Sequence, residues 1–122
     1  DDGVAKTRDN GGLTVNIALN YGGRGELVQA AKTIAAKVKA GVLDIDGIGE
    51  NTISEALFTR DIPDPDLIVR TSGEERLSNF LLYQGAYAEL YFTPVHWPDL
   101  SRQDFVDMLV NYQSRARRFG GL

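Results

Sequence analysis

Residues 66–87, DLIVRTSGEERLSNFLLYQGAY, are the stretch around which the chain is organised. The stretch opens with the apolar run LIV, which is typical of a buried strand and predicts one over residues 66–71. A polar loop follows, and apolar residues at helical spacing then predict a helix over residues 79–86 with Ser78 as its N-cap. A strand that leads through a polar loop into a helix is where α/β proteins bind ligands.

Two arginines in this loop, Arg70 and Arg76, indicate an anion site. The planar guanidinium donates two parallel hydrogen bonds to phosphate, and Arg70 is expected at the carboxyl end of its strand. Ser78 would add a hydroxyl beside the free N–H groups of the helix start. If the loop turns back, two arginines and a serine fit a diphosphate better than a small anion. The alternative is a surface ion-pair network, because such networks are common.

The remaining elements follow from hydrophobic periodicity and from capping residues. Strands are predicted over residues 13–20 and 88–93, and helices over residues 26–40, over residues 53–58 and between Ser101 and Gly120. Residues 1–12 are polar and rich in turn formers, so we expect a solvated segment. The order β-α-α-β-α-β-α predicts an α/β fold with a parallel sheet flanked by helices. Three strands make a thin sheet, which indicates an incomplete domain.

Two features leave a functional and a structural interpretation open. The glycine-rich turn YGGRG at residues 21–25 could bind phosphate or could simply connect a strand to a helix. His96 and Trp97, which lie between two prolines, could serve a site, although such a pair more often packs at a domain edge.

The options for a metal site are narrow. The chain has no cysteine and one histidine, which excludes thiolate chemistry, cysteine-based zinc sites and multi-histidine sites. A metal would therefore be held by carboxylates, which favours Mg²⁺. Glu89 is the best candidate ligand, because it begins an otherwise apolar strand, where a charge needs a metal or a partner. A structural ion pair between Glu89 and an arginine is an equal alternative.

Composition excludes several classes of function. The chain has 122 residues and a net charge of −4, which does not favour non-specific nucleic-acid binding. No apolar run reaches the ~20 residues of a membrane span. The first dozen residues are acidic and lack an apolar segment, so we do not expect a signal peptide. No motif for a serine or cysteine nucleophile and no P-loop is present, so the expected chemistry is binding and polarising a diphosphate.

Residues 70–93, RTSGEERLSNFLLYQGAYAELYFT, resemble the signature of cis-prenyltransferases, the family that includes the bacterial undecaprenyl diphosphate synthases. Three other pieces agree in order and spacing: GLTVNIALNYGGRGELVQAA at residues 12–31, WPD at residues 97–99 and RRFGG at residues 117–121. The resemblance covers nearly the whole chain. It implies that residues 1–122 are the C-terminal half of a single cis-prenyltransferase domain with the fold of that family.

The resemblance implies roles for the loop residues. Residues matching Arg70, Arg76 and Ser78 bind the diphosphate of isopentenyl diphosphate, the chain-extending unit, in this family. The residue matching Glu89 helps to coordinate Mg²⁺ there. The position of Glu75 often carries histidine or glutamine in relatives, so its role stays open.

Four further positions take roles from the same resemblance. Asn20 matches a motif beside the active site, and Leu13 matches the far end of the tunnel that holds the growing chain. Arg118 and Gly120 match an Arg-x-Gly motif that reaches into the partner subunit's site, which implies a homodimer. The family motif that binds the allylic diphosphate and supplies the essential aspartate is absent from this sequence, so no catalytic residue is assigned to it.

The implied activity is the addition of isopentenyl diphosphate units to an allylic diphosphate such as farnesyl diphosphate, with a polyprenyl diphosphate such as undecaprenyl diphosphate as product. The resemblance also implies a cytoplasmic protein without a transmembrane segment, which contacts the membrane only peripherally for product release. Two alternatives remain: a non-catalytic partner subunit of a two-component prenyltransferase, and a phosphate-binding α/β domain without transfer activity.

Overall fold

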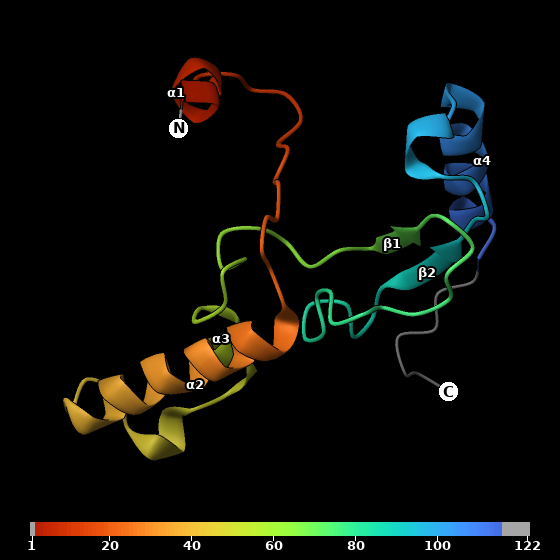
Figure 1. The fold of residues 1–122 in the computed structure, drawn as a ribbon. Coiled ribbons are helices and arrows are strands. Elements are labelled where there is room, and N and C mark those ends of the chain that lie inside the picture. Colours follow the sequence, from red (N-terminus) through yellow and green to blue (C-terminus); the bar gives the residue numbers. More distant parts are fainter. Residues whose placement is uncertain (1, 116–122) are drawn as a thin grey trace.

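A small parallel sheet lies towards one end of the structure (Figure 1). The computed structural model describes residues 2–115. Within these residues the sheet has two strands, β1 (Leu67–Arg70) and β2 (Glu89–Phe92), with Leu67 opposite Glu89 and Arg70 opposite Phe92. Figure 1 shows α4 beside β2, whereas α2 and α3 lie together beyond the other end of the sheet. The predicted parallel pairing of these two strands is confirmed, and the architecture fits an incomplete α/β domain.

Four helices and two 3₁₀ turns lie within the described residues. They are α1 (Asp2–Thr7), α2 (Gly23–Lys39), α3 (Glu50–Ser54) and α4 (Arg102–Gln113), with short 3₁₀ turns at Ile45–Gly47 and Trp97–Asp99. Helix α4 begins as predicted, because Asp104 Oδ2 accepts from the Ser101 N–H at 2.8 Å and the Asp104 N–H donates to Ser101 Oγ at 3.2 Å. The Ser101 hydroxyl, which donates to Asp104 Oδ2 at 2.5 Å, and the Ser101 N–H lower the pKa of Asp104, because both stabilise its carboxylate. Helix α2 ends before Gly41, which takes the left-handed φ of 68° expected at that position.

The strand predicted over residues 13–20 is not formed. This segment is extended, but it has no place in the described two-stranded sheet. Its apolar side chains are largely exposed, from 72% at Val15 to 92% at Leu13. A strand needs a partner for its backbone N–H and C=O groups, and hydrophobic alternation alone does not supply one.

The helix predicted over residues 79–86 is replaced by a series of turns. Ser78, Asn79 and Leu81 have φ values of 49°, 68° and 43°, which a right-handed helix excludes. Ser78 is therefore not an N-cap. The conformation is determined by contacts of Asn79 with another helix, described below, rather than by the local apolar spacing.

One smaller prediction differs from the structure in its bounds, and another is confirmed for the described residues. The helix expected over residues 53–58 is α3, which begins earlier because Thr52 Oγ1 accepts the Gly49 N–H at 3.1 Å. Residues 1–12 are expected to be solvated, and residues 2–12 are all exposed, including the short helix α1.

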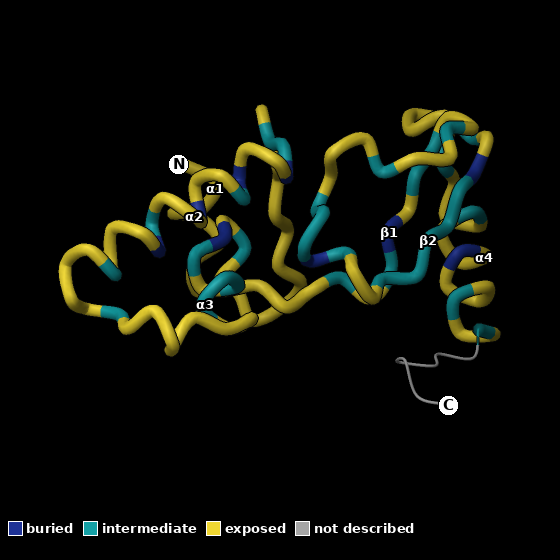
Figure 2. Tube along the Cα trace, turned by 90° about the horizontal axis from the view of Figure 1, so that it is seen from below, coloured by how far each residue is buried: buried dark blue, intermediate teal, exposed yellow. Residues whose placement is uncertain are grey.

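The core is small and divided between the two ends of the molecule. Ala30, Ile34 and Leu57 are buried where α2 meets the segment after α3, whereas Ile68 is buried on β1 and Met108 under α4. Figure 2 shows these buried positions separated by long exposed stretches of chain. In the part of the chain that the structure describes, no helix has the length and apolar character needed to cross a membrane.

Two glycines of α2 provide a test of how closely the 79–82 turn packs against this helix. A Cβ at Gly23 would lie 2.9 Å from Leu82 Cγ and 3.2 Å from the Asn79 carbonyl oxygen, whereas a Cβ at Gly25 would meet nothing within 4 Å. We predict that Gly23→Ala lowers the free energy of unfolding by about 1–3 kcal/mol. Gly25→Ala is the matched control and should raise it by up to about 1 kcal/mol through helix propensity. Urea unfolding measures both, and equal effects would contradict the packing.

Candidate functional site

The loop that follows β1 is held against the segment that follows β2. The Thr93 N–H donates to the Arg70 carbonyl, the Gly73 N–H to the Thr93 carbonyl and the Ser72 N–H to the Val95 carbonyl, each at 3.0 Å. Ser72 and Gly73 both take left-handed φ values, 70° and 72°, which reverse the chain direction. The hydrogen bonding between the strands thus continues past their ends and fixes the start of the loop.

The loop turns back on Arg70, as the sequence predicts. Arg70 NH1 donates to Ser78 Oγ at 2.7 Å and also to the carbonyl oxygen of Arg76. We call the group formed by Arg70, Arg76 and Ser78 the anion cradle. Both acceptors of Arg70 are neutral, so its positive charge is not cancelled by a carboxylate. A charged guanidinium beside a hydroxyl is suited to bind an anion.

The second arginine of the cradle is engaged by an acid. The Arg76 guanidinium forms an ion pair with Glu74, and the two side chains are 64% and 41% exposed. Exposed ion pairs of this kind contribute only about 0–1 kcal/mol. The surface ion pair considered as an alternative is therefore present at Arg76, but it is weak enough for an anionic ligand to replace Glu74.

A small cavity lies against the cradle. Its volume is about 200 Å³, and its lining combines two arginines with apolar side chains: Ile68, Val69, Arg70, Arg76, Leu77 and Phe80. Such a lining can accept a ligand with an anionic end and an apolar end.

Glu89 lies at the other end of the sheet from the cradle. It pairs with Leu67 in register, three residues before Arg70, which corresponds to about 10 Å along the strand. Glu89 Oε2 accepts from Arg115 NH1 at 2.8 Å, and the same nitrogen donates to the Leu90 carbonyl at 2.9 Å. The structural ion pair with an arginine, predicted as the alternative to a metal, is therefore present, and Arg115 uses it to hold the end of α4 on β2. No group of three or more acidic, histidine or cysteine side chains is arranged to hold a metal among residues 2–115.

The other predicted site residues are not part of the cradle. Asn20, with a left-handed φ of 55°, lines a neighbouring cavity of about 410 Å³, which meets the cradle cavity at Phe80. Leu13 is exposed on the extended segment. Arg118 and Gly120 lie outside the described residues.

The residues that follow β2 contribute one side chain beside the cradle. His96 Nδ1 lies 3.3 Å from Ser72 Oγ, next to the loop that leaves β1. Trp97, expected to pack at a domain edge, is instead 74% exposed.

The glycine-rich turn at the start of α2 is occupied by the chain itself. The Gly23 N–H donates to the Asn79 carbonyl oxygen and the Arg24 N–H to Asn79 Oδ1, both at 2.8 Å. These are the N–H groups that a phosphate at this helix start would need. The geometry favours the connector interpretation of the turn. The only signal for this role of Asn79 in the sequence is that asparagine tolerates left-handed φ.

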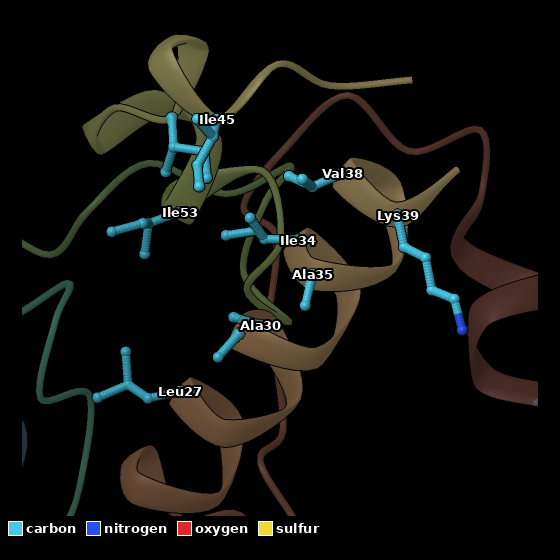
Figure 3. Close-up of a pocket in the computed structure, with 10 residues that line it drawn as sticks. Leu27, Ala30, Ile34, Ala35, Val38, Lys39, Ile45 and Ile53 are labelled. Atoms are coloured by element: carbon cyan, nitrogen blue, oxygen red, sulfur yellow. The ribbon is translucent and has the colours of Figure 1, made fainter. Parts of the chain in front are cut away.

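A larger, apolar cavity is remote from the cradle. It has a volume of about 570 Å³ and lies between α2 and the segment that carries Ile45 and Ile53. Figure 3 shows Leu27 and Ile34 of α2 on the same side as these isoleucines. Lys39 is its only charged lining residue, so it is suited to an apolar group rather than to a diphosphate.

A buried carboxylate, that of Glu26 in α2, bonds to the turn that follows the cradle. Glu26 is 2% exposed and accepts hydrogen bonds from the Tyr21 hydroxyl at 2.5 Å, from the Phe58 N–H at 2.9 Å and from Gln84 Nε2 at 3.1 Å. Burial and the Glu26 carboxylate raise the pKa of Tyr21 to about 12, because the phenolate would be desolvated beside a negative charge. Gln84 Oε1 is buried without a hydrogen-bond partner.

Comparison with known sequences identifies related proteins along nearly the whole chain. The profile of a prenyltransferase family, described as "Putative undecaprenyl diphosphate synthase", matches residues 1–120. An isoprenyl transferase from Heliobacterium mobile is 53% identical over 119 residues, which are 98% of this chain and 46% of the relative. A ditrans,polycis-undecaprenyl-diphosphate synthase from Pasteurella multocida is 52% identical over 115 residues, 94% of this chain and 48% of the relative. The chain thus spans about half the length of the curated relatives it matches.

Comparison with solved structures gives the same result. Lavandulyl diphosphate synthase from Lavandula x intermedia, solved in complex with dimethylallyl diphosphate, has a TM-score of 0.91 and 44% identity, covering 95% of this chain and 50% of that one. A probable undecaprenyl diphosphate synthase from Campylobacter jejuni has a TM-score of 0.77 and 36% identity, covering 95% of this chain and 51% of that one. The arrangement of the cradle therefore occurs within a fold shared by diphosphate-handling enzymes.

The buried network predicts how stability depends on alkaline pH. The pKa of Tyr21 is about 12 in the folded chain and about 10 when unfolded, so its contribution is complete below pH 10 and is lost as the pH rises through 12. Tyr21→Phe keeps the edge-to-face ring contact with Phe80, whose centroid distance is 5.8 Å, and removes the titration. We predict that the difference in unfolding free energy between the two proteins is constant below pH 10 and then shifts in favour of Tyr21→Phe. A difference that stays constant to pH 12 would contradict the assigned pKa.

Proposed function

The chain belongs to the undecaprenyl diphosphate synthase family of prenyltransferases, and on this premise we propose that it supplies the isopentenyl diphosphate site of a cis-prenyltransferase. The observation that carries the proposal is the cradle itself. Arg70 reaches Ser78 Oγ at 2.7 Å and keeps an uncancelled positive charge, at the carboxyl end of a parallel strand.

The cradle would bind the diphosphate in two ways. Arg70 would donate its guanidinium N–H groups together with the Ser78 hydroxyl, since both already lie at hydrogen-bond distance from each other. Arg76 would leave Glu74 and take the second phosphate, because that exposed ion pair is weak. The apolar side of the cavity, which includes Leu77 and Phe80, would face the isopentenyl group.

The proposed reaction is a 1′-4 condensation. The bond between the allylic carbon and its diphosphate breaks, the double bond of isopentenyl diphosphate attacks the resulting cation, and a proton is lost to form a cis double bond. The contribution of this chain is to bind and orient the extending unit, which converts an encounter of two substrates into a reaction within one complex. The substrates of the whole protein would be isopentenyl diphosphate and an allylic diphosphate such as farnesyl diphosphate.

A magnesium ion is part of the proposal, with Glu89 as one ligand. Mg²⁺ is commonly held by one or two carboxylates together with substrate phosphates, so a single glutamate fits as a partial ligand. The position of Glu89, about 10 Å along the strand from Arg70, does not favour an ion shared with a diphosphate on the same cradle. When bound, the ion would neutralise charge on a diphosphate.

We further propose that the protein acts as a cytoplasmic homodimer that makes a polyprenyl diphosphate of the undecaprenyl type. The exposed apolar side chains of α4 support a second copy as partner. Phe105 is 60% exposed and Val110 57%, and exposed apolar side chains that lie together on a surface often mark a protein–protein interface. Arg118 and Gly120, which follow α4, would then reach the partner subunit's site.

A second candidate function, a phosphate-binding domain without transfer activity, would use the same pairing of Arg70 with Ser78. Calorimetry with isopentenyl diphosphate and with inorganic phosphate separates the two. Preference for isopentenyl diphosphate supports the prenyltransferase, and equal affinity supports the alternative.

Substitution of Arg70 tests the cradle in an enzyme that joins this chain to the N-terminal half of a family member (the joined enzyme). We predict that Arg70→Ala raises the KM for isopentenyl diphosphate by about 10- to 100-fold, because charged hydrogen bonds contribute about 1.5–3 kcal/mol. Arg70→Lys should be intermediate, since it keeps the charge but loses the fork. Arg60→Ala is the control, because Arg60 forms only an exposed pair with Asp61 at 3.5 Å. Normal kinetics in Arg70→Ala would overturn the assignment.

Substitution of Glu89 tests the magnesium proposal. We predict that Glu89→Gln raises the Mg²⁺ concentration for half-maximal activity of the joined enzyme by at least about tenfold. Arg115→Gln breaks the same ion pair but keeps the carboxylate, so it should leave the Mg²⁺ requirement unchanged. If both variants lose stability equally and neither changes the Mg²⁺ requirement, Glu89 has only a structural role.

A further inference from the structure

Asn79 joins the anion cradle to the start of helix α2. It is the residue directly after Ser78, whose hydroxyl lies 2.7 Å from Arg70 NH1. Asn79 itself accepts two hydrogen bonds from α2, through its carbonyl oxygen from the Gly23 N–H and through Oδ1 from the Arg24 N–H, both at 2.8 Å. The backbone next to Ser78 is therefore held by the start of helix α2.

The conformation around Asn79 needs this support. Ser78 and Asn79 both take left-handed φ values, 49° and 68°, which residues with a Cβ adopt only when surrounding contacts hold them there. Asparagine tolerates this region better than most residues, and its side-chain oxygen can accept a free N–H at the start of α2, whose own N-cap, Gly22, makes no side-chain hydrogen bond. One residue thus satisfies both demands of the site.

Gly22, the N-cap of α2, and Gly23, its first residue, allow the turn to approach this closely. A Cβ at Gly22 would lie 2.7 Å from Asn79 Nδ2, and one at Gly23 would lie 3.2 Å from the Asn79 carbonyl oxygen. The glycine-rich turn therefore serves the cradle indirectly, as a surface against which Asn79 packs.

We propose that Asn79 is a positioning residue for isopentenyl diphosphate: by capping α2 it holds the Ser78 hydroxyl at the distance from Arg70 that the diphosphate requires. The inference rests on the proposed function of the cradle. Asn79 would act through Ser78, so its loss should weaken binding of the extending unit and leave the allylic substrate unaffected.

Three substitutions in the joined enzyme test this role. Asn79→Ala removes the side-chain hydrogen bond to the Arg24 N–H and places at φ 68° a residue that rarely adopts left-handed φ values. The KM for isopentenyl diphosphate should therefore rise about three- to tenfold, whereas kcat and the KM for the allylic substrate should not change. Asn79→Gly removes the side-chain cap but accepts the backbone conformation, and should have a smaller effect. Asn79→Asp keeps a cap oxygen for the Arg24 N–H and should restore a KM close to that of the unsubstituted enzyme.

Asn51→Ala is the matched control, because Asn51 is an exposed asparagine at the start of a different helix, α3. Equal KM values for isopentenyl diphosphate in Asn79→Ala and Asn51→Ala would overturn the positioning role, as would a parallel loss for both substrates. If Asn79→Ala does not fold, the Gly and Asp variants decide, and equal KM values in these two overturn the inference. Failure of the unsubstituted joined enzyme to bind isopentenyl diphosphate would instead overturn the proposed function.

Discussion

The buried carboxylate of Glu26 is the constraint on which the middle of the structure depends. A carboxylate that is 2% exposed, with no cation bonded to it among residues 2–115, is tolerated only when hydrogen bonds replace its water. Its donors come from three separate segments, through Tyr21, the Phe58 N–H and Gln84. Loss of any one donor would leave buried charge unsatisfied, at a cost of about 1–3 kcal/mol or more. Glu26 thereby fixes where the turn after the cradle can lie relative to α2.

The cradle depends on this packing because it has no helix of its own. The sequence suggested that helix N–H groups behind Ser78 would help to bind the anion, and that source is absent. Positioning comes instead from close approaches on both sides of the turn. Gly23 allows Asn79 to contact α2, and a Cβ at Gly85 would lie 2.9 Å from Ile68 Cδ1 of β1. The anion site is therefore built from side chains on a tightly packed turn, and backbone strain there is held by contacts with elements distant in sequence.

The parts of the fold that sequence could predict are those determined by neighbouring residues. Helix α4 begins at Ser101 because Asp104, three residues later, completes the cap. Strands β1 and β2 follow from short apolar runs between turn formers. The strand expected over residues 13–20 failed because a strand needs a partner that alternation does not provide. An arginine was a predicted partner of Glu89, but which arginine could not be predicted, since Arg115 lies 26 residues away and meets Glu89 through the packing of α4 on β2. The same distinction between local and distant contacts holds for the site. The contact of Arg70 with Ser78 was predictable because a short loop joins them, whereas the contact of Asn79 with α2 joins segments far apart in the sequence.

The two arginines of the cradle differ in what they have to give up to bind an anion. Arg70 donates to neutral oxygens, from Ser78 and the Arg76 backbone. A diphosphate would therefore interact with the full positive charge of Arg70, whose guanidinium is already held in one orientation. Arg76 is neutralised by Glu74, so a ligand gains only the difference between a phosphate and an exposed carboxylate as partner. The affinity of the site should therefore come mainly from Arg70. Arg76 then contributes chiefly to selectivity, because a single small anion satisfied by Arg70 and Ser78 has no second phosphate with which to displace Glu74.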